Sequence, residues 1–170
     1  MKLIKANQRG FTLIEILVAI VVGGMVVAAA STVVMQILQS SRSSSQMTAL
    51  RQVQTAGYWV SHDALQAQEM NTNDFLYIKW TDWDDGDIHE IEYSLVGSGT
   101  LKHLQRQEII NDDADHPTIT IVARYVDSSQ TSCTPANHVF VPGELLTFMV
   151  TATMEEQTET RTYKIKPRAL

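Results

Sequence analysis

A run of 26 residues without a charged side chain, from Ile16 to Ser41, constrains the fold of this chain more than any other feature. As an α-helix rising about 1.5 Å per residue, it would extend roughly 39 Å. The hydrocarbon layer of a membrane is only about 30 Å thick. The run therefore predicts a single helix that spans a membrane, with length to spare.

One carboxylate, Glu15, stands at the start of this run. A charge within a spanning helix costs roughly 2.5–3.5 kcal/mol at the helix centre and less near an end. One interpretation is that Glu15 reaches back to the headgroups. The other interpretation is that Glu15 pairs with a cation. A cut after Gly10 would leave Phe11 with a free α-amine, which is largely protonated near neutral pH. In an array of such helices, Glu15 of one copy would meet the Phe11 amine of the next.

The hexapeptide Gly10-Phe11-Thr12-Leu13-Ile14-Glu15, after a short basic leader, resembles the class III signal of type IV pilins and type II secretion pseudopilins. The resemblance implies cleavage between Gly10 and Phe11 by a prepilin peptidase and N-methylation of Phe11 by its methyltransferase activity. It also implies filament assembly steered by Glu15. The implied partners are other pilin-like subunits, the peptidase and an assembly platform in the inner membrane. No cofactor is implied, and the chain is expected not to be an enzyme.

The charges predict the orientation of the chain. Lys2, Lys5 and Arg9 precede the apolar run, and the positive-inside rule keeps them in the cytoplasm. Everything after Leu38 then faces outward from the bacterial cytoplasmic membrane. Loss of the three leader cations takes the formal charge from −6 to −9. Such an acidic chain is a poor non-specific ligand for nucleic acid, which is bound by neutralising phosphates.

The sequence divides into four segments. Residues 1–10 form the cleaved leader, 11–38 the membrane-spanning half of the first helix, 39–71 its outer half, and 72–170 a head domain. The serine-rich stretch from Gln39 to Gln46 is either a soft joint or the solvated middle of one helix. Beyond it, an apolar stripe at three- and four-residue steps continues the helix: Met47, Leu50, Val53, Gly57, Val60, Ala64 and Ala67.

After Asn73 the apolar period changes to two, which is typical of strands. Strands are expected at residues 75–83, 88–95, 101–109, 118–126, 145–154 and 160–165, with a polar loop over 127–143. Asp-Gly at Asp85-Gly86 is a strong hairpin signal. The expected fold is α+β and pilin-like: a long N-terminal helix, membrane-spanning in its first half, packed on an antiparallel sheet.

Three segments resemble the minor pseudopilins of type II secretion, in the branch of J-type pseudopilins and W-type minor pilins. They are Val60 to Leu65, Ile91 to Leu95, and Leu104-Gln105-Arg106. Major pilins usually carry a proline near the end of the apolar run, whereas the first proline here is Pro117. The resemblance therefore favours a minor subunit.

Two acidic stretches are the sole candidates for a metal site, because the five histidines have no metal-ligand spacing. Calcium takes six to eight oxygen ligands, but neither stretch has the spacing of a calcium loop, so turn formation explains both and calcium is the alternative. The carboxylates concerned are Asp82, Asp84, Asp85, Asp87, Asp112, Asp113 and Asp115. The lone cysteine, Cys133, is expected to be a free thiol in a loop. Of the three tryptophans, Trp83 is the one expected to be exposed outside the core.

The sequence thus predicts a low-copy subunit of a type II secretion pseudopilus or a type IV pilus, placed at the filament tip. Two alternatives stay open. An adhesin or DNA-uptake minor pilin would show a basic or aromatic patch on its head. An ordinary single-pass anchor protein that only mimics the signal would keep Met1.

Overall fold

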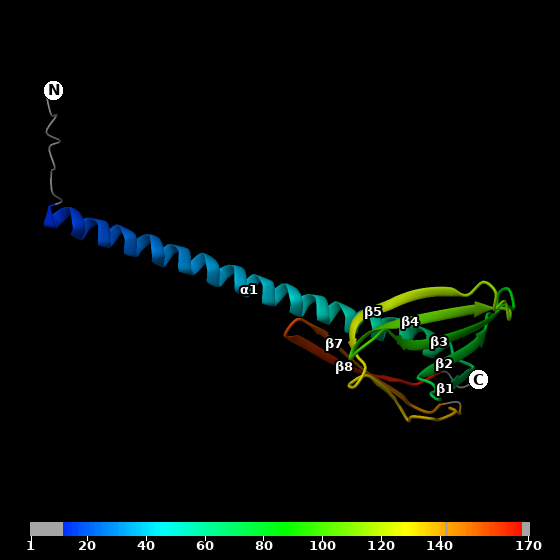
Figure 1. The fold of residues 1–170 in the computed structure, drawn as a ribbon. Coiled ribbons are helices and arrows are strands. Elements are labelled where there is room, and N and C mark those ends of the chain that lie inside the picture. The colour runs from blue at the N-terminus through cyan, green and yellow to red at the C-terminus, as the bar shows by residue number, and fades with distance from the viewer. Residues whose placement is uncertain (1–11, 142, 168–170) are drawn as a thin grey trace, which may run out of the picture. The chain divides into compact units, whose positions relative to one another are not determined.

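The computed structural model describes residues 12–141 and 143–167, which form one long helix and an antiparallel sheet (Figure 1). The elements in chain order are α1 (Leu13–Gln66), β1 (Glu69–Asn71), β2 (Leu76–Thr81), β3 (Ile88–Val96), β4 (Leu101–Ile110), β5 (Thr118–Asp127), β6 (Ser132–Thr134), β7 (Leu146–Met154) and β8 (Gln157–Ile165). The chain separates into two compact units, residues 1–41 and residues 42–170. The α+β class expected from the sequence is confirmed.

The first unit contains the apolar part of α1. The helix begins where the Thr12 carbonyl accepts hydrogen bonds from the backbone N–H groups of Glu15 and Ile16, at 3.0 and 3.2 Å. It is the one helix in the described residues that is long and apolar enough to cross a membrane, with a mean hydropathy of 2.6 in its most apolar window. Its large apolar side chains are exposed from Leu13 to Leu38. The serine-rich stretch is helical.

In the second unit, the remaining part of α1 packs one face against the sheet. The residues buried there are Ser45, Ala49, Val53, Ala56, Gly57, Val60, Asp63 and Ala64. The predicted stripe is correct at Val53, Gly57, Val60 and Ala64, but wrong at Met47, whose side chain is exposed. Small residues dominate the buried face, so helix and sheet approach closely.

The helix ends earlier than the sequence suggested. It stops at Gln66, and the residues expected to be its last turn form β1, which pairs with β2 in the register Met70↔Ile78. The Gln68 N–H donates to the Lys79 carbonyl at 2.9 Å. Sheet hydrogen bonds and burial of Met70 therefore replace the expected last helical turn.

The sheet runs in the order β1-β2-β3-β4-β5-β7-β6, and β8 pairs with the other side of β7. Figure 1 shows β2, β3, β4 and β5 as successive neighbours. The join between β5 and β7 rests on one residue pair, Val126↔Ala152. Two further expectations were wrong in detail: β6 lies inside the predicted loop, and β8 begins at Gln157 instead of Thr160.

Candidate functional site

The first candidate site is the start of α1, where Glu15 stands in the first helical turn. Its side chain is exposed in the isolated chain. The partial positive charge of a helix N-terminus favours a carboxylate in this turn. Gly10 and Phe11, the predicted cleavage and methylation residues, lie outside the residues that the structure describes.

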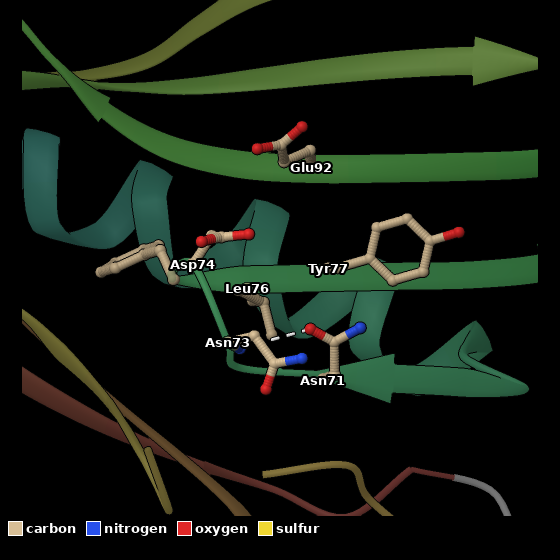
Figure 2. Close-up of a pocket in the computed structure, with 7 residues that line it drawn as sticks. Asn71, Asn73, Asp74, Leu76, Tyr77 and Glu92 are labelled. Atoms are coloured by element: carbon tan, nitrogen blue, oxygen red, sulfur yellow. Dashed lines mark hydrogen bonds between the residues drawn. The ribbon is translucent and has the colours of Figure 1, made fainter. Parts of the chain in front are cut away.

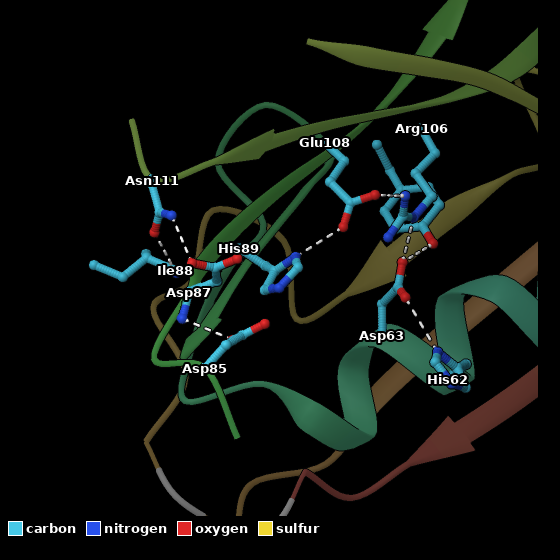
Figure 3. Close-up of polar contacts among 10 residues, drawn as sticks. His62, Asp63, Asp85, Asp87, Ile88, His89, Arg106, Glu108 and Asn111 are labelled. Carbon is cyan, nitrogen blue, oxygen red and sulfur yellow. Dashed lines mark hydrogen bonds and ion pairs between the residues drawn. The ribbon is translucent and has the colours of Figure 1, made fainter. Parts of the chain in front are cut away.

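The second candidate site is a buried polar cluster that joins α1 to two strands (Figure 3). Oδ2 of Asp63, on α1, accepts hydrogen bonds from the Tyr93 hydroxyl on β3 at 2.5 Å and from Arg106 Nε on β4 at 2.7 Å. The side chains of Asp63 and Arg106 are only 1% and 7% exposed. Removing two charges from water is costly. Their mutual attraction offsets that cost only when their remaining polar atoms are also hydrogen-bonded.

The cluster continues along the sheet through Glu108. Arg106 Nη1 donates to Glu108 Oε2 at 2.8 Å, and Nδ1 of His89 lies 3.0 Å from Glu108 Oε1. The His89 ring stacks on Trp80, with ring centroids 5.2 Å apart. The guanidinium carbon of Arg106 lies 5.2 Å from the ring centroid of Trp59, a cation–π distance. Arg106 thus bonds to a carboxylate on each side and to an aromatic face.

The pKa values in this cluster reflect its low polarity. Burial raises the pKa of Tyr93, and the neighbouring Asp63 carboxylate raises it further. Burial by itself would lower the pKa of Arg106, but its hydrogen bonds to Glu108 and Asp63 raise it. Burial would likewise raise the pKa of Glu108, yet the hydrogen bonds from Arg106 and His89 lower it below its ordinary value. Across the neutral range Arg106 and Glu108 are therefore charged, and Tyr93 keeps the hydroxyl proton that it donates.

This arrangement fixes the helix on the sheet and offers no surface for a reaction. The three side chains Asp63, Tyr93 and Arg106 come from the three segments that the sequence analysis singled out, and the structure brings them together. Glu108 and His89 were missed as members. The signal for Glu108 was its place two residues after Arg106, on the same face of a strand.

The two acidic stretches also meet, but through a turn contact. Asn111 Nδ2 donates to Asp87 Oδ1 at 2.7 Å, and the Ile88 N–H donates to Asn111 Oδ1 at 2.9 Å. Carboxylates of Asp82 and Asp85 accept backbone N–H groups within the β2–β3 turn. Within the described part of the chain, no group of three or more His, Cys, Asp or Glu side chains is placed to hold a metal ion.

A pocket of about 250 Å³ lies beside β2 (Figure 2). It is lined by Asn71, Asn73, Asp74, Phe75, Leu76, Tyr77 and Glu92. Burial raises the pKa of Tyr77, and the Glu90 carboxylate nearby adds to the shift. The lining offers hydrogen-bond donors and acceptors and holds no serine, cysteine or histidine.

The remaining predicted residues fall at separate places. Trp83 is 84% exposed at the β2–β3 turn, as expected from its position off the apolar face. Cys133 is a free thiol, but it lies buried in β6 and not in a loop. Burial raises the pKa of its thiol to about 12.

Comparison with known families finds a match in the N-terminal segment. Residues 5–31 match the model of the prokaryotic N-terminal methylation motif. The N-terminal segment therefore carries a motif of this kind. It spans Gly10, Phe11 and Glu15 and runs into the apolar part of α1. No curated protein and no solved structure matches this chain.

Proposed function

We propose that this chain belongs to the type IV pilin-like proteins and is a minor pilin or pseudopilin subunit, cleaved between Gly10 and Phe11 and N-methylated at Phe11. The match to the methylation motif over residues 5–31 is the observation that carries this proposal. The mature chain stays in the bacterial cytoplasmic membrane with its head outside. It then enters a type II secretion pseudopilus or a type IV pilus, at or near the tip.

The position of Glu15 supports the assembly step. It is the sole acidic residue in the first turn of a helix whose next charged residue is Arg42. In a lipid environment such a carboxylate is stabilised by pairing with a cation. The methylated Phe11 amine of a neighbouring subunit supplies one, together with the helix N-terminus.

Contacts within the head domain support the assignment as a minor subunit of a secretion pseudopilus or a pilus. Asp63, Tyr93 and Arg106, drawn from the three segments that resemble minor pseudopilins, form one bonded cluster. The absence of proline before Pro117 agrees with a minor subunit. Its partners are then other pilin-like subunits, the prepilin peptidase and the inner-membrane assembly platform.

Mass spectrometry of the membrane-extracted protein tests the processing step. A mature chain that begins at methylated Phe11 supports the proposal, and an intact Met1 overturns it in favour of an uncleaved anchor protein. For assembly, Glu15→Gln removes the charge with little change in size. We expect it to be cleaved normally but lost from sheared filament fractions, whereas Glu156→Ala, at the exposed β7–β8 turn, is retained. Equal incorporation of both variants would remove Glu15 from the mechanism.

An adhesin role is a second candidate, favoured by the exposed Trp83 at the β2–β3 turn. Four aspartates surround this indole in sequence, which disfavours DNA as its ligand because phosphates would be repelled. Trp83→Ala would then abolish surface attachment while filament incorporation stays normal. Unchanged attachment would exclude the adhesin role of this residue.

A further inference from the structure

The pocket beside β2 opens on the outward face of the sheet. A row of cross-strand neighbours runs through it, because Tyr77 on β2 pairs with Asn71 on β1 and with Glu92 on β3. Directly paired residues of antiparallel strands have their side chains on the same face. The alternate residues of β2, Leu76 and Ile78, are buried in the core. The row therefore lies on the face of the sheet that turns away from the core.

The short loop from β1 to β2 forms one wall of this pocket and is held at several points. The buried hydroxyl of Thr72 donates to a backbone carbonyl in the segment after β6, at 2.6 Å. The side-chain oxygen of Asn71 accepts the Asn73 N–H at 3.2 Å (Figure 2). The Phe75 side chain packs against the hydrophobic core. The backbone that carries Asp74 is therefore fixed at the rim of the pocket.

The two carboxylates of the lining, Asp74 and Glu92, are exposed and unpaired. No hydrogen bond or ion pair joins either carboxylate to another of the described residues. By contrast, the acid two positions earlier on β3, Glu90, pairs with Lys79. On the other side of β3, Glu92 faces Gln107, which carries no charge. The pocket thus holds two negative charges that are not neutralised by a cation from the described part of the chain.

The electrostatic potential at the aromatic residue of the row is also negative. Burial raises the pKa of Tyr77, and the Glu90 carboxylate raises it further. Lys79 lowers this pKa, but its effect is smaller than that of Glu90, and Glu69 adds to the rise. The face of an aromatic ring itself attracts cations. A cation beside the Tyr77 ring is therefore favoured both by the ring and by the acids around it.

The shape of the pocket selects among cations. Calcium takes six to eight oxygen ligands, whereas no group of three or more His, Cys, Asp or Glu side chains in the described ranges is placed to hold a metal ion. An ammonium group is a compact, strongly hydrated point charge. A guanidinium group is planar and weakly hydrated, stacks on aromatic rings, and donates to carboxylates in pairs. A pocket of about 250 Å³ with an aromatic ring and two carboxylates suits the guanidinium group.

We propose that this pocket binds an arginine side chain presented by a partner protein, with the guanidinium beside Tyr77 and between the Asp74 and Glu92 carboxylates. Free arginine has the same guanidinium group, but the two acids would repel its α-carboxylate. In a protein that carboxyl group is part of a peptide bond and carries no charge. The inference goes beyond the proposed function and does not depend on cleavage at Gly10.

An NMR titration of the full-length ¹⁵N-labelled chain in neutral detergent micelles tests this binding. The probe is Nα-acetyl-arginine amide, which mimics an arginine within a peptide. We expect saturable shifts of the Asn71, Tyr77 and Glu92 amide signals with a Kd of about 1–10 mM, as suits a single small group. Nα-acetyl-citrulline amide has nearly the same shape without the charge and should not bind. Free arginine should bind about threefold more weakly or worse.

Matched variants assign the binding to the residues named. Glu92→Gln and Asp74→Asn each remove one charge at nearly constant size, and we expect each to raise the Kd about fivefold. Glu156→Gln, at the exposed β7–β8 turn, removes the same charge elsewhere and should leave the Kd unchanged. Tyr77→Phe keeps the ring and should keep the binding. Tyr77→Leu keeps an apolar side chain in the strand but loses the ring, and it should weaken the binding.

Four results would overturn the proposal. They are equal Kd values for Glu92→Gln and Glu156→Gln, equal binding of the citrulline probe, tighter binding of free arginine, and displacement of the probe by calcium chloride at the same concentration. The third would assign the pocket to a free amino acid, and the fourth to a metal ion. Cleavage at Gly10 is scored separately by mass spectrometry, so a failure here leaves the filament role untouched.

Discussion

The Asp63 carboxylate on α1 lies 2.7 Å from Arg106 Nε on β4, in a part of the head that excludes solvent. The Tyr93 hydroxyl shares the same carboxylate oxygen. One helix and two strands are therefore joined at a single oxygen atom. This contact and the apolar packing around it together hold the helix on the sheet.

Removing the cation from this cluster should destabilise the head severely. Arg106→Met leaves Asp63 and Glu108 with no guanidinium, and breaking a buried pair typically costs about 3–5 kcal/mol. Urea unfolding followed by near-UV circular dichroism measures the loss. The control is Lys79→Met: Lys79 pairs with Glu90 on a part-exposed surface of the sheet. There we expect a much smaller loss, because an ion pair near water contributes little to stability. Equal losses in the two variants would show that the buried cluster contributes no more than a surface pair.

Acid should weaken the head through Glu108. Its pKa is lower in the folded chain than in the unfolded chain, so the folded state binds the proton less readily. The stabilisation is present above the unfolded pKa, about 4.3, and is lost as the pH falls through the folded value. The free energy of unfolding should therefore fall more between about pH 5 and pH 3 in the wild type than in Glu108→Gln. Parallel curves for the two proteins would contradict this assignment. The pKa values of Asp127 and Glu144 are also lowered. Both proteins carry these two groups, so their contributions cancel when the two curves are compared.

Gly57 should not tolerate a methyl group. A Cβ at this position would lie 1.9 Å from Cζ of the Tyr163 ring. That ring is held in place, since its hydroxyl donates to the Val53 carbonyl at 3.0 Å and its face stacks near Phe148. We expect Gly57→Ala to lower the free energy of unfolding by about 1–3 kcal/mol, as other overpacked sites do.

The matched control lies in the same helix. A Cβ at Gly24 meets nothing within 4 Å, so Gly24→Ala should leave the stability of the head unchanged. Combining Gly57→Ala with Tyr163→Ala should cost less than the sum of the two single changes, because the clash is gone. Additive losses would mean that the ring does not set the size limit at Gly57.

The local pattern of the sequence predicted most of the sheet, and the reason is physical. β2 alternates buried and outward residues along its whole length, and β3 and β7 do so over part of theirs, so the period is visible without knowing their neighbours. β1 and β6 are too short to show a period. They exist because longer strands offer hydrogen bonds to them, as in the pair Met70↔Ile78. Such partners are distant in sequence, and local propensity does not reveal them.

The residues of the candidate sites also differ in how far the sequence alone predicts them. Gly10, Phe11 and Glu15 form a contiguous motif, so the sequence alone identifies them. Asp63 and Arg106 are separated by 43 positions, and their contact depends on how the helix crosses the sheet. The segments that hold them could be singled out by resemblance, but the shared carboxylate oxygen could not be predicted.

The Cys133 thiol should be unreactive until the head unfolds. It is buried in β6, and burial raises its pKa to about 12, so the thiolate is about one molecule in 10,000 at pH 8. An aromatic disulfide reagent at pH 8 should therefore react with the native chain only as fast as the head opens. In 6–8 M urea the same thiol should react at once, as an unfolded cysteine does. The exposed Thr162→Cys variant serves as the positive control, since its added thiol should react immediately while Cys133 stays silent. Immediate reaction of Cys133 in the folded wild type would mean that β6 does not stay paired with β7.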